Sequence, residues 1–230
     1  MTGVQTCALP IYSGATGDIV FSLPTIKAMG GGTLYITNFD KQRSESIKKL
    51  IAVQPYITNV VIKDGENIGY NLNRFRDYAG HFNNLVEAHF KGQNIPIDPT
   101  WKEGWLTLPK ADKFKDNKYA VINRTTNYED WGFNWAKEVE YLKSIADEVI
   151  FIGYKSEWEL FNATFNTDVK YYECDFLEGA YLIQNAVMFT GCYSCWSTIA
   201  MGLGGEYRLV QAPGHTCSSL FEPRETIINI

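Results

Sequence analysis

The residue types best suited to chemistry begin with a glycine-bearing turn, GATGD at 14–18, that leads into an expected helix over 18–29. Glycines let the backbone approach a ligand closely, and the free N–H groups of a helix N-terminus attract anions. Asp18 adds a carboxylate at the same point, where it could act as a base or serve as an ordinary acidic N-cap or first-turn acid. The turn is not a P-loop, because no Gly-Lys-Ser/Thr follows, and the GxGxxG dinucleotide fingerprint is absent.

Two later segments also combine a strand end with glycine, hydroxyl or arginine side chains. In FTGCYS at 189–194 an expected strand ends in Gly191, and the Ser194 hydroxyl and the first N–H groups of the next helix could hold a phosphate. The alternative is an ordinary N-cap serine. In NRTTNY at 123–128, Arg124 follows a strand and precedes hydroxyl residues, which suits pyrophosphate recognition. The alternative there is a solvated loop in which the arginine clamps the backbone.

The elements that must position these segments alternate along the chain between apolar strands and amphipathic helices. Alternation of this kind predicts βαβ units and mainly parallel sheets, here in two blocks. Ligands of such sheets lie beyond the carboxyl ends of the strands, which is where the three segments occur. The expected strands are 33–37, 57–62, 119–123, 148–153, 168–172, 187–190 and 207–210, and the expected helices are 18–29, 44–54, 81–91, 135–146, 156–164, 177–185 and 196–203.

Composition and charge indicate a globular protein with two unequal halves. The chain has 230 residues, of which 45% are hydrophobic and 20% charged, and its formal net charge is -5. No apolar run approaches the roughly 18–20 residues of a membrane helix, and the acidic balance argues against a general nucleic-acid coat protein. Residues 1–118 carry 14 Lys/Arg against 11 Asp/Glu, a net charge of +3, whereas residues 119–230 carry 7 against 15, a net charge of -8. This asymmetry predicts two domains, 12–117 and 118–230.

The cysteines and the first residues offer little chemistry. Cys192 and Cys195 form a lone CxxC without the second pair that a zinc site would need, so we expect reduced thiols packed at a helix start. Residues 1–11, MTGVQTCALPI, look like a translated sequencing adapter and not like a signal peptide, and we exclude them from functional reasoning. His81 and His89 lie eight apart on an expected helix, and we expect them to face solvent or the core and not a metal.

Taken in order, the segments resemble the heptosyltransferase-like glycosyltransferases of family nine. Residues 13–37, SGATGDIVFSLPTIKAMGGGTLYIT, look like their amino-terminal signature, in which a glycine turn is followed by Gly-Asp, an apolar pair and Leu-Pro. Residues 177–215 look like their carboxyl-terminal signature, with Phe-x-Gly-x-x-Ser, an Ala-containing helix ending in Leu-Gly, a strand and Pro-Gly. Residues 124–135 resemble the loop that opens the donor-binding domain. Residues 71–75 and 84–89 are similar to smaller phage and metagenomic members.

The resemblance implies an α/β fold of the GT-B type, with two facing Rossmann-like domains, mainly parallel sheets and the active site between them. The implied reaction moves a sugar from a nucleotide-diphosphate donor to a hydroxyl acceptor, a glycan or a modified nucleobase, and needs no metal and no cofactor. Asp18 would be the general base. The residues assigned to the donor are Gly14, Thr16, Gly17, Arg124, Thr125, Gly191, Tyr193, Ser194, Cys195 and His215.

Departures from the family pattern leave two other readings open. Family members commonly carry Asp before the serine, Gly after it and His one turn into the helix, where this chain has Tyr193, Cys195 and Thr198. One alternative is therefore a non-catalytic protein that binds a nucleotide or nucleotide-sugar on the same fold. The other is an unrelated flavodoxin-like or epimerase-like protein with one continuous sheet. With no expected membrane span, we predict a cytoplasmic protein of a bacterium or an infected host cell.

Overall fold

The structure is a computed structural model, and it describes residues 8–12, 15–37, 40–63, 71–78, 84–110, 112–115, 117–126, 132–211 and 227–229. These residues form two compact units, one ending at Pro109 and the other starting at Lys110. The sequence places the boundary slightly later, between 117 and 118. Each unit has its own sheet, so the reading with one continuous sheet is wrong for the described residues.

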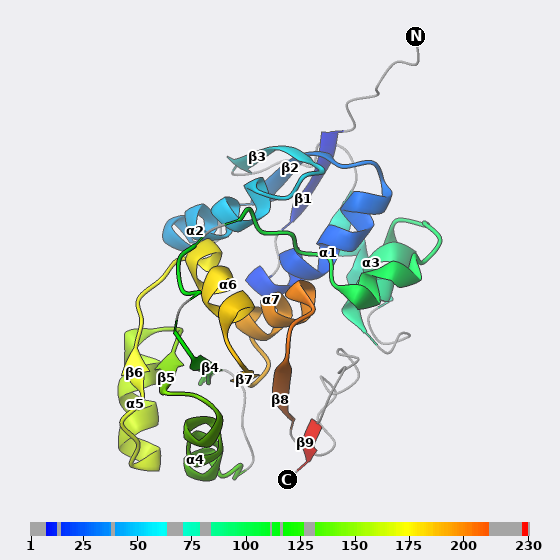
Figure 1. Cartoon of the computed structure of the whole chain (residues 1–230). Coiled ribbons are helices and arrows are strands. Elements are labelled where there is room, and N and C mark those ends of the chain that lie inside the picture. Colours follow the sequence, from blue (N-terminus) through cyan, green and yellow to red (C-terminus); the bar gives the residue numbers. More distant parts are fainter. Residues whose placement is uncertain are drawn as a thin grey trace. The chain divides into compact units, whose positions relative to one another are not determined.

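The first unit contains a parallel three-stranded sheet in the order β1-β2-β3. Helices α1 and α2 make the two strand-to-strand connections. Because both connections step across the sheet in the same direction and such crossovers are right-handed, both helices cover the same face (Figure 1). The elements of this unit are β1 Ala8–Tyr12, α1 Thr16–Ala28, β2 Gly32–Thr37, α2 Lys41–Ala52, β3 Ile57–Lys63, the 3-10 helix η1 Leu72–Asp77, α3 Leu85–Gly92 and the 3-10 helix η3 Pro99–Glu103.

Helix α1 contains a proline, and another part of the unit compensates for it. Pro24 has no N–H group, so the carbonyl of Val20 four residues earlier lacks its usual helical donor. The indole N–H of Trp105 donates a hydrogen bond to that carbonyl at 3.0 Å. Val20 and Trp105 are both buried, so water cannot replace the indole N–H as the donor to this carbonyl. The helix therefore continues through the proline to Ala28.

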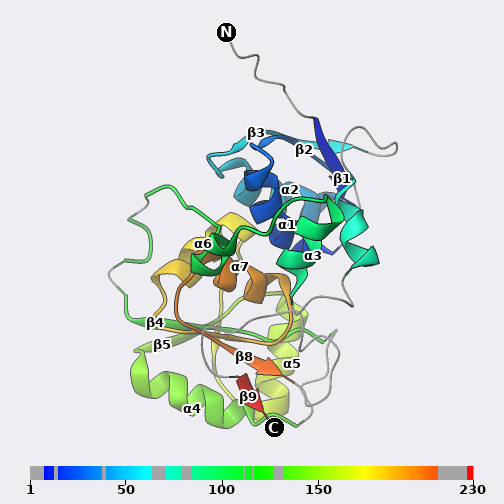
Figure 2. The same ribbon diagram turned by 90° about the vertical axis from the view of Figure 1, so that its right-hand side faces the viewer.

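The second unit contains a six-stranded parallel sheet in the order β6-β5-β4-β7-β8-β9. Counted from β4, this is the 3-2-1-4-5-6 order of a doubly wound Rossmann sheet. Helices α4 and α5 cover one face and α6 and α7 the other (Figures 1 and 2). The elements are β4 Tyr119–Asn123, α4 Trp135–Ile145, β5 Glu148–Phe151, α5 Lys155–Phe165, β6 Lys170–Tyr171, α6 Phe176–Asn185, β7 Phe189–Gly191, α7 Cys195–Leu203, β8 Tyr207–Gln211 and β9 Ile227–Asn229.

Aromatic rings fill the core between this sheet and α4 and α5. The Trp135 ring is fully buried, and its centroid lies 4.9 Å from that of Phe133 and 5.6 Å from that of Phe161, both in edge-on contacts. Edge-on geometry is favoured by the ring quadrupoles. Phe133 and Trp135 are thus packing residues of this core.

The observed elements confirm an α/β fold with mainly parallel sheets. The expected strands include neither β9 nor β1, most of which lies in the segment 1–11 that was set aside, and the expected helices do not include the 3-10 helices η1 and η3. Asp18 lies in the first turn of α1, the second of the two structural positions that the sequence allows, and Ala15 holds the N-cap position. Within the described residues, no helix is both long enough and apolar enough to cross a membrane.

Candidate functional site

The strand order of the second unit reverses between β4 and β7. From β4 the sheet continues through β5 to β6, and from β7 it continues the other way through β8 to β9. Open parallel sheets bind ligands outside the carboxyl ends of the strands at such a reversal. Asn123, which ends β4, lies opposite Gly191, which ends β7. The two segments that the sequence singles out separately therefore leave the sheet side by side.

Helix α7 begins at this reversal with Ser194 as its N-cap. The Ser194 hydroxyl accepts a hydrogen bond from the backbone N–H of Ser197 at 3.3 Å and donates one to Oδ1 of Asn123 at 2.7 Å. The N-cap role that the sequence left open for Ser194 is thus confirmed. Tyr193 is buried, with 7% of its surface exposed, and Cys195 is half-buried as the first residue of α7. The first turn of α7 contains no acidic residue.

The segment after β4 is held by backbone donors and by one arginine. The N–H of Thr125 donates to the buried Sγ of Cys192 at 3.1 Å, and this contact joins it to the segment after β7. The N–H of Thr126 donates to Oε1 of Glu157 at 3.2 Å. The Arg124 guanidinium carbon lies 5.3 Å from the centroid of the Phe165 ring, a cation–π contact with the end of α5.

Two glycines allow the strand ends to approach one another. A Cβ on Gly191 would lie 2.7 Å from the Phe189 ring and 3.0 Å from Oγ of Ser197. A Cβ on Gly153, whose φ is 138°, would lie 2.9 Å from Nδ2 of Asn123 and 3.2 Å from Oε2 of Glu157. Any larger residue at these two positions would displace the polar groups at the sheet edge.

The first unit holds the candidate base at the start of α1. Asp18 lies in the first turn, where the helix dipole favours a negative charge, and its side chain is 22% exposed. Its Oδ2 lies 3.6 Å from Nη2 of Arg76, which is 46% exposed. The same guanidinium donates to Oδ1 of Asn73 at 2.8 Å and lies 4.7 Å from the Phe75 ring centroid. The contact with Arg76 thus limits the orientations of a carboxylate that solvent can still reach.

His89 supports this first turn from the core. Its ring is fully buried and stacks on the Phe75 ring, with the centroids 4.2 Å apart. Burial and, to a smaller extent, the charge of Arg76 lower the pKa of His89 to about 3, although a hydrogen bond to the backbone of Asp18 opposes the shift. His89 is therefore neutral near pH 7 and faces the core, one of the two placements that the sequence leaves open.

The structure thus gathers the expected residues into two groups, each within its own unit. Thr16, Gly17 and Asp18 share the start of α1, and Arg124, Thr125, Gly191, Tyr193, Ser194 and Cys195 lie at the β4–β7 edge. Gly14 and His215 lie outside the described residues. Sequence reasoning gave no role at these groups to four residues that fix them, namely Arg76, His89, Asn123 and Glu157. The available signals were a histidine on the apolar face of α3 and a polar residue ending an otherwise apolar strand.

Comparison with solved structures shows which known proteins share this fold. No protein-family model and no curated protein matches the chain. Among solved structures, a glycosyl transferase of family 9 from Veillonella parvula superposes with a TM-score of 0.69 at 9% identity, over 96% of this chain and 84% of that chain. E. coli heptosyltransferase WaaC, solved with ADP, gives 0.55 at 12% identity over 95% and 89%. The iron-containing dodecameric glycosyltransferase TibC from enterotoxigenic E. coli gives 0.57 at 16% identity over 93% and 60%.

At these identities the likeness establishes the fold. The chain has the fold of heptosyltransferase-like glycosyltransferases of family 9, which confirms at that level the resemblance that the motifs indicate. TibC is described as iron-containing. In the part of this chain that the structure describes, no three or more His, Cys, Asp or Glu side chains gather where they could hold a metal ion.

Proposed function

We propose that the chain is a glycosyltransferase that moves a sugar from a nucleotide-diphosphate donor to a hydroxyl acceptor. The observation that carries the proposal is the coincidence of two independent findings. The fold is that of family 9 transferases, and the Gly191–Ser194 and Arg124–Thr125 segments lie together at the strand-order reversal of the second unit. That edge is where a doubly wound sheet binds a nucleotide.

The donor diphosphate would bind at the start of α7. The helix dipole and the first-turn N–H groups favour an anion, and no acidic side chain in that turn neutralises them. Arg124 would contribute after leaving its contact with Phe165. Charge that develops on the departing nucleotide diphosphate would be stabilised there, and such stabilisation is often the largest catalytic contribution.

Asp18 would act on the acceptor. The acceptor hydroxyl oxygen attacks the anomeric carbon of the sugar, the bond from that carbon to the diphosphate oxygen breaks, and Asp18 takes the hydroxyl proton. Its 22% exposure and first-turn position support this role, because an acceptor can reach the carboxylate and the helix dipole favours a negative charge there. The products are the glycosylated acceptor and the nucleotide diphosphate.

The proposal requires the two units to act as two facing Rossmann-like domains, with Asp18 contributed by one and the diphosphate by the other. The separate parallel sheets and the division near Pro109 support it. We also propose that transfer needs no added divalent cation, because the sequence lacks an Asp-x-Asp motif. Equal transfer rates with and without a chelator are expected, and loss of transfer on chelation would refute this part.

The central experiment measures donor binding and transfer separately. A thermal-shift panel of nucleotide diphosphates and nucleotide-sugars identifies the donor, because any compound that binds only the native state raises the melting temperature. Asp18→Asn should leave the Kd for that donor within about twofold and lower the transfer rate by about 10²–10⁴-fold, the usual contribution of a general base. Unchanged transfer in Asp18→Asn would remove Asp18 from the mechanism.

The proposed diphosphate site at the start of α7 is tested by a substitution that should stabilise the helix but weaken diphosphate binding. Cys195→Asp places a carboxylate in the first turn of α7, which should stabilise the helix by about 0.3–1 kcal/mol but repel a bound diphosphate. Cys195→Asn, of similar size and uncharged, is the matched control. Weaker ADP binding in the aspartate variant alone, with a melting temperature no lower than that of the control, is the expected pattern. Equal ADP affinity in both variants would place the diphosphate elsewhere.

A non-catalytic nucleotide-sugar-binding protein on the same fold is the second candidate. The observation that favours it is Tyr193, which is buried and supplies no carboxylate where family members commonly carry Asp. Such a protein would bind the donor and neither hydrolyse nor transfer it, and Asp18→Asn would change nothing. Turnover by the unmodified chain decides against this candidate.

A further inference from the structure

We infer that Asn123 is a positioning residue of the proposed donor site, and that it takes the hydroxyl proton of Ser194 away from the donor. The inference rests on the proposed function, because it says which groups of that site are available to a diphosphate. The proposed role does not require Asn123 to contact the diphosphate. Asn123 acts through the segment that starts α7.

Asn123 joins the ends of three strands. Its side chain is fully buried at the end of β4. Nδ2 donates to the carbonyl of Ile152, just after β5, at 2.7 Å, and Oδ1 accepts from the Ser194 hydroxyl, after β7, at 2.7 Å. Its backbone carbonyl accepts the N–H of Cys192 at 3.3 Å. One amide thereby sets the positions of the turns after β5 and β7 relative to β4.

The direction of the bond to Ser194 decides what that serine can do. A hydroxyl has one hydrogen to donate, and here Oδ1 of Asn123 receives it. The remaining polar capacity of Oγ is to accept, and the Ser197 N–H occupies one of its two lone pairs. A phosphate oxygen of the donor also only accepts, so it cannot bond to Oγ in this arrangement. The Asn123 amide cannot reverse its orientation without placing its N–H₂ against Ser194 and its oxygen against the Ile152 carbonyl. Ser194 is therefore a structural cap, and the donor phosphates are left to backbone N–H groups and cationic side chains.

The surroundings of Asn123 leave it little freedom to move. Gly153 leaves only enough room for the amide, since a Cβ there would lie 2.9 Å from Nδ2. Glu157 holds the neighbouring turns with one carboxylate, because its two oxygens accept the N–H groups of Thr126 and Tyr154, each at 3.2 Å. A buried polar network with all its members bonded is rigid, and losing one member leaves costly unsatisfied groups.

A double-mutant cycle tests the inference with ADP as the probe, chosen because WaaC was solved with it. Asn123→Ala should raise the Kd for ADP by about 3- to 10-fold, the equivalent of one lost hydrogen bond. Ser194→Ala should raise it by a similar factor, and the double variant should bind no more weakly than the weaker single variant. If Ser194 instead donates its proton to a phosphate, Ser194→Ala will weaken binding equally in the unmodified chain and in the Asn123→Ala variant, and that result would overturn the inference.

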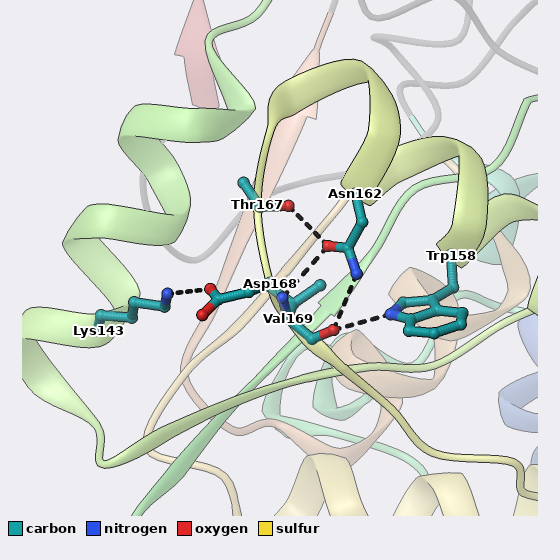
Figure 3. A network of polar contacts seen from close by, with 6 residues as sticks. All are labelled: Lys143, Trp158, Asn162, Thr167, Asp168 and Val169. Carbon is teal, nitrogen blue, oxygen red and sulfur yellow. Dashed lines mark hydrogen bonds and ion pairs between the residues drawn. The ribbon is translucent and has the colours of Figure 1, made fainter.

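Asn162 supplies the matched control. It also lies in the second unit and makes several hydrogen bonds: Nδ2 donates to the Val169 carbonyl at 3.1 Å, and Oδ1 accepts from the Thr167 hydroxyl at 2.8 Å and from the Val169 N–H at 3.2 Å (Figure 3). It lies before β6, at the amino edge of the parallel sheet, opposite the edge of Asn123. Asn162→Ala should lower the melting temperature and keep the Kd for ADP within about twofold. An equal rise in Kd for both variants would show general loosening and refute the positioning role.

A charge-changing variant covers the case in which Asn123→Ala does not fold. Asn123→Asp keeps the shape and an acceptor for Ser194 but can ionise beside the anion. Its Kd for ADP should rise as the pH increases from about 5 to about 8 more steeply than that of the unmodified protein, with Asn162→Asp showing no such extra dependence. A pH-independent Kd in Asn123→Asp contradicts the inference. Failure of the unmodified chain to bind ADP or any nucleotide diphosphate would refute the proposed function itself.

Discussion

Replacing Trp105 with phenylalanine should destabilise α1 although Trp105 is far from it in sequence. The substitution removes the N–H that bonds the Val20 carbonyl, and Pro24 cannot supply another. An unsatisfied buried carbonyl costs about 1–3 kcal/mol, and the smaller ring also loses packing against Phe21 and Trp101. The expected loss is therefore a large fraction of the total stability of an ordinary domain, about 5–15 kcal/mol.

A second substitution separates the hydrogen bond from the packing. Pro24→Ala restores an N–H at position 24, which can bond the Val20 carbonyl along the helix. In that background Trp105→Phe loses packing alone, so its cost should fall by about 1–3 kcal/mol. The difference between the two backgrounds measures the indole bond, because the packing loss is common to both.

Hydrogen exchange of peptides covering α1 is the suitable assay, because it reports the opening of that helix even if the two units unfold separately. Urea unfolding followed by far-UV circular dichroism gives the matching global value. If Trp105→Phe accelerates exchange equally in the unmodified chain and in the Pro24→Ala variant, the bond to Val20 contributes nothing and the explanation of the proline in α1 is wrong.

Three further predictions concern strain and pH. Gly31→Ala should cost more stability than Gly30→Ala, because a Cβ on Gly31 would lie 1.9 Å from the Tyr56 carbonyl oxygen whereas that on Gly30 meets nothing within 4 Å, and both glycines have positive φ; equal melting temperatures would contradict this. Burial raises the pKa of Glu138, so the folded chain binds its proton more tightly and stability should fall as the pH rises above about 4.3, a decline that Glu138→Gln should lack in urea unfolding. The pKa of His89 is lowered to about 3, so the unfolded chain binds the extra proton and stability should fall as the pH drops below about 6.5. His89→Phe should remove that acid dependence.

Much of the fold could be predicted because each strand is marked locally. The run YAVIN predicts a strand over 119–123, and β4 has those bounds because the run is apolar, β-branched and followed by polar loop residues. The glycines at 30–32 predict the end of α1, and the N–H groups of Gly30 and Gly31 do bond the last carbonyls of that helix. β9 could not be found in this way, because its three residues become a strand only through pairing with β8.

The candidate site likewise contains residues that the sequence indicates and residues that only the structure shows. Glycine, serine and arginine that follow predicted strands can be recognised in the sequence. Because the carboxyl ends of parallel strands lie at the same edge of a sheet, these residues are expected to lie near one another. The residues that orient them are not visible, because their partners are remote: Asn123 bonds Ser194 at 71 positions and Ile152 at 29 positions along the chain. Nothing local marks Glu157 as the acceptor of the Thr126 N–H, 31 positions away. Sequence patterns thus indicate which groups meet at the edge but not which of them remain available to a ligand.

The two helix starts at the centre of the proposal are electrostatic opposites. The first turn of α1 carries Asp18, whose charge already satisfies the positive end of that dipole, so this helix start favours a cation or a proton and not a second anion. The first turn of α7 carries no acid, and its capping hydroxyl is bonded to Asn123, so its dipole is left for an anion from outside. A reaction that removes a proton and releases an anion can use one start of each kind. In the proposed mechanism the chain would supply the base and the anion site from two helix starts that differ in a single carboxylate.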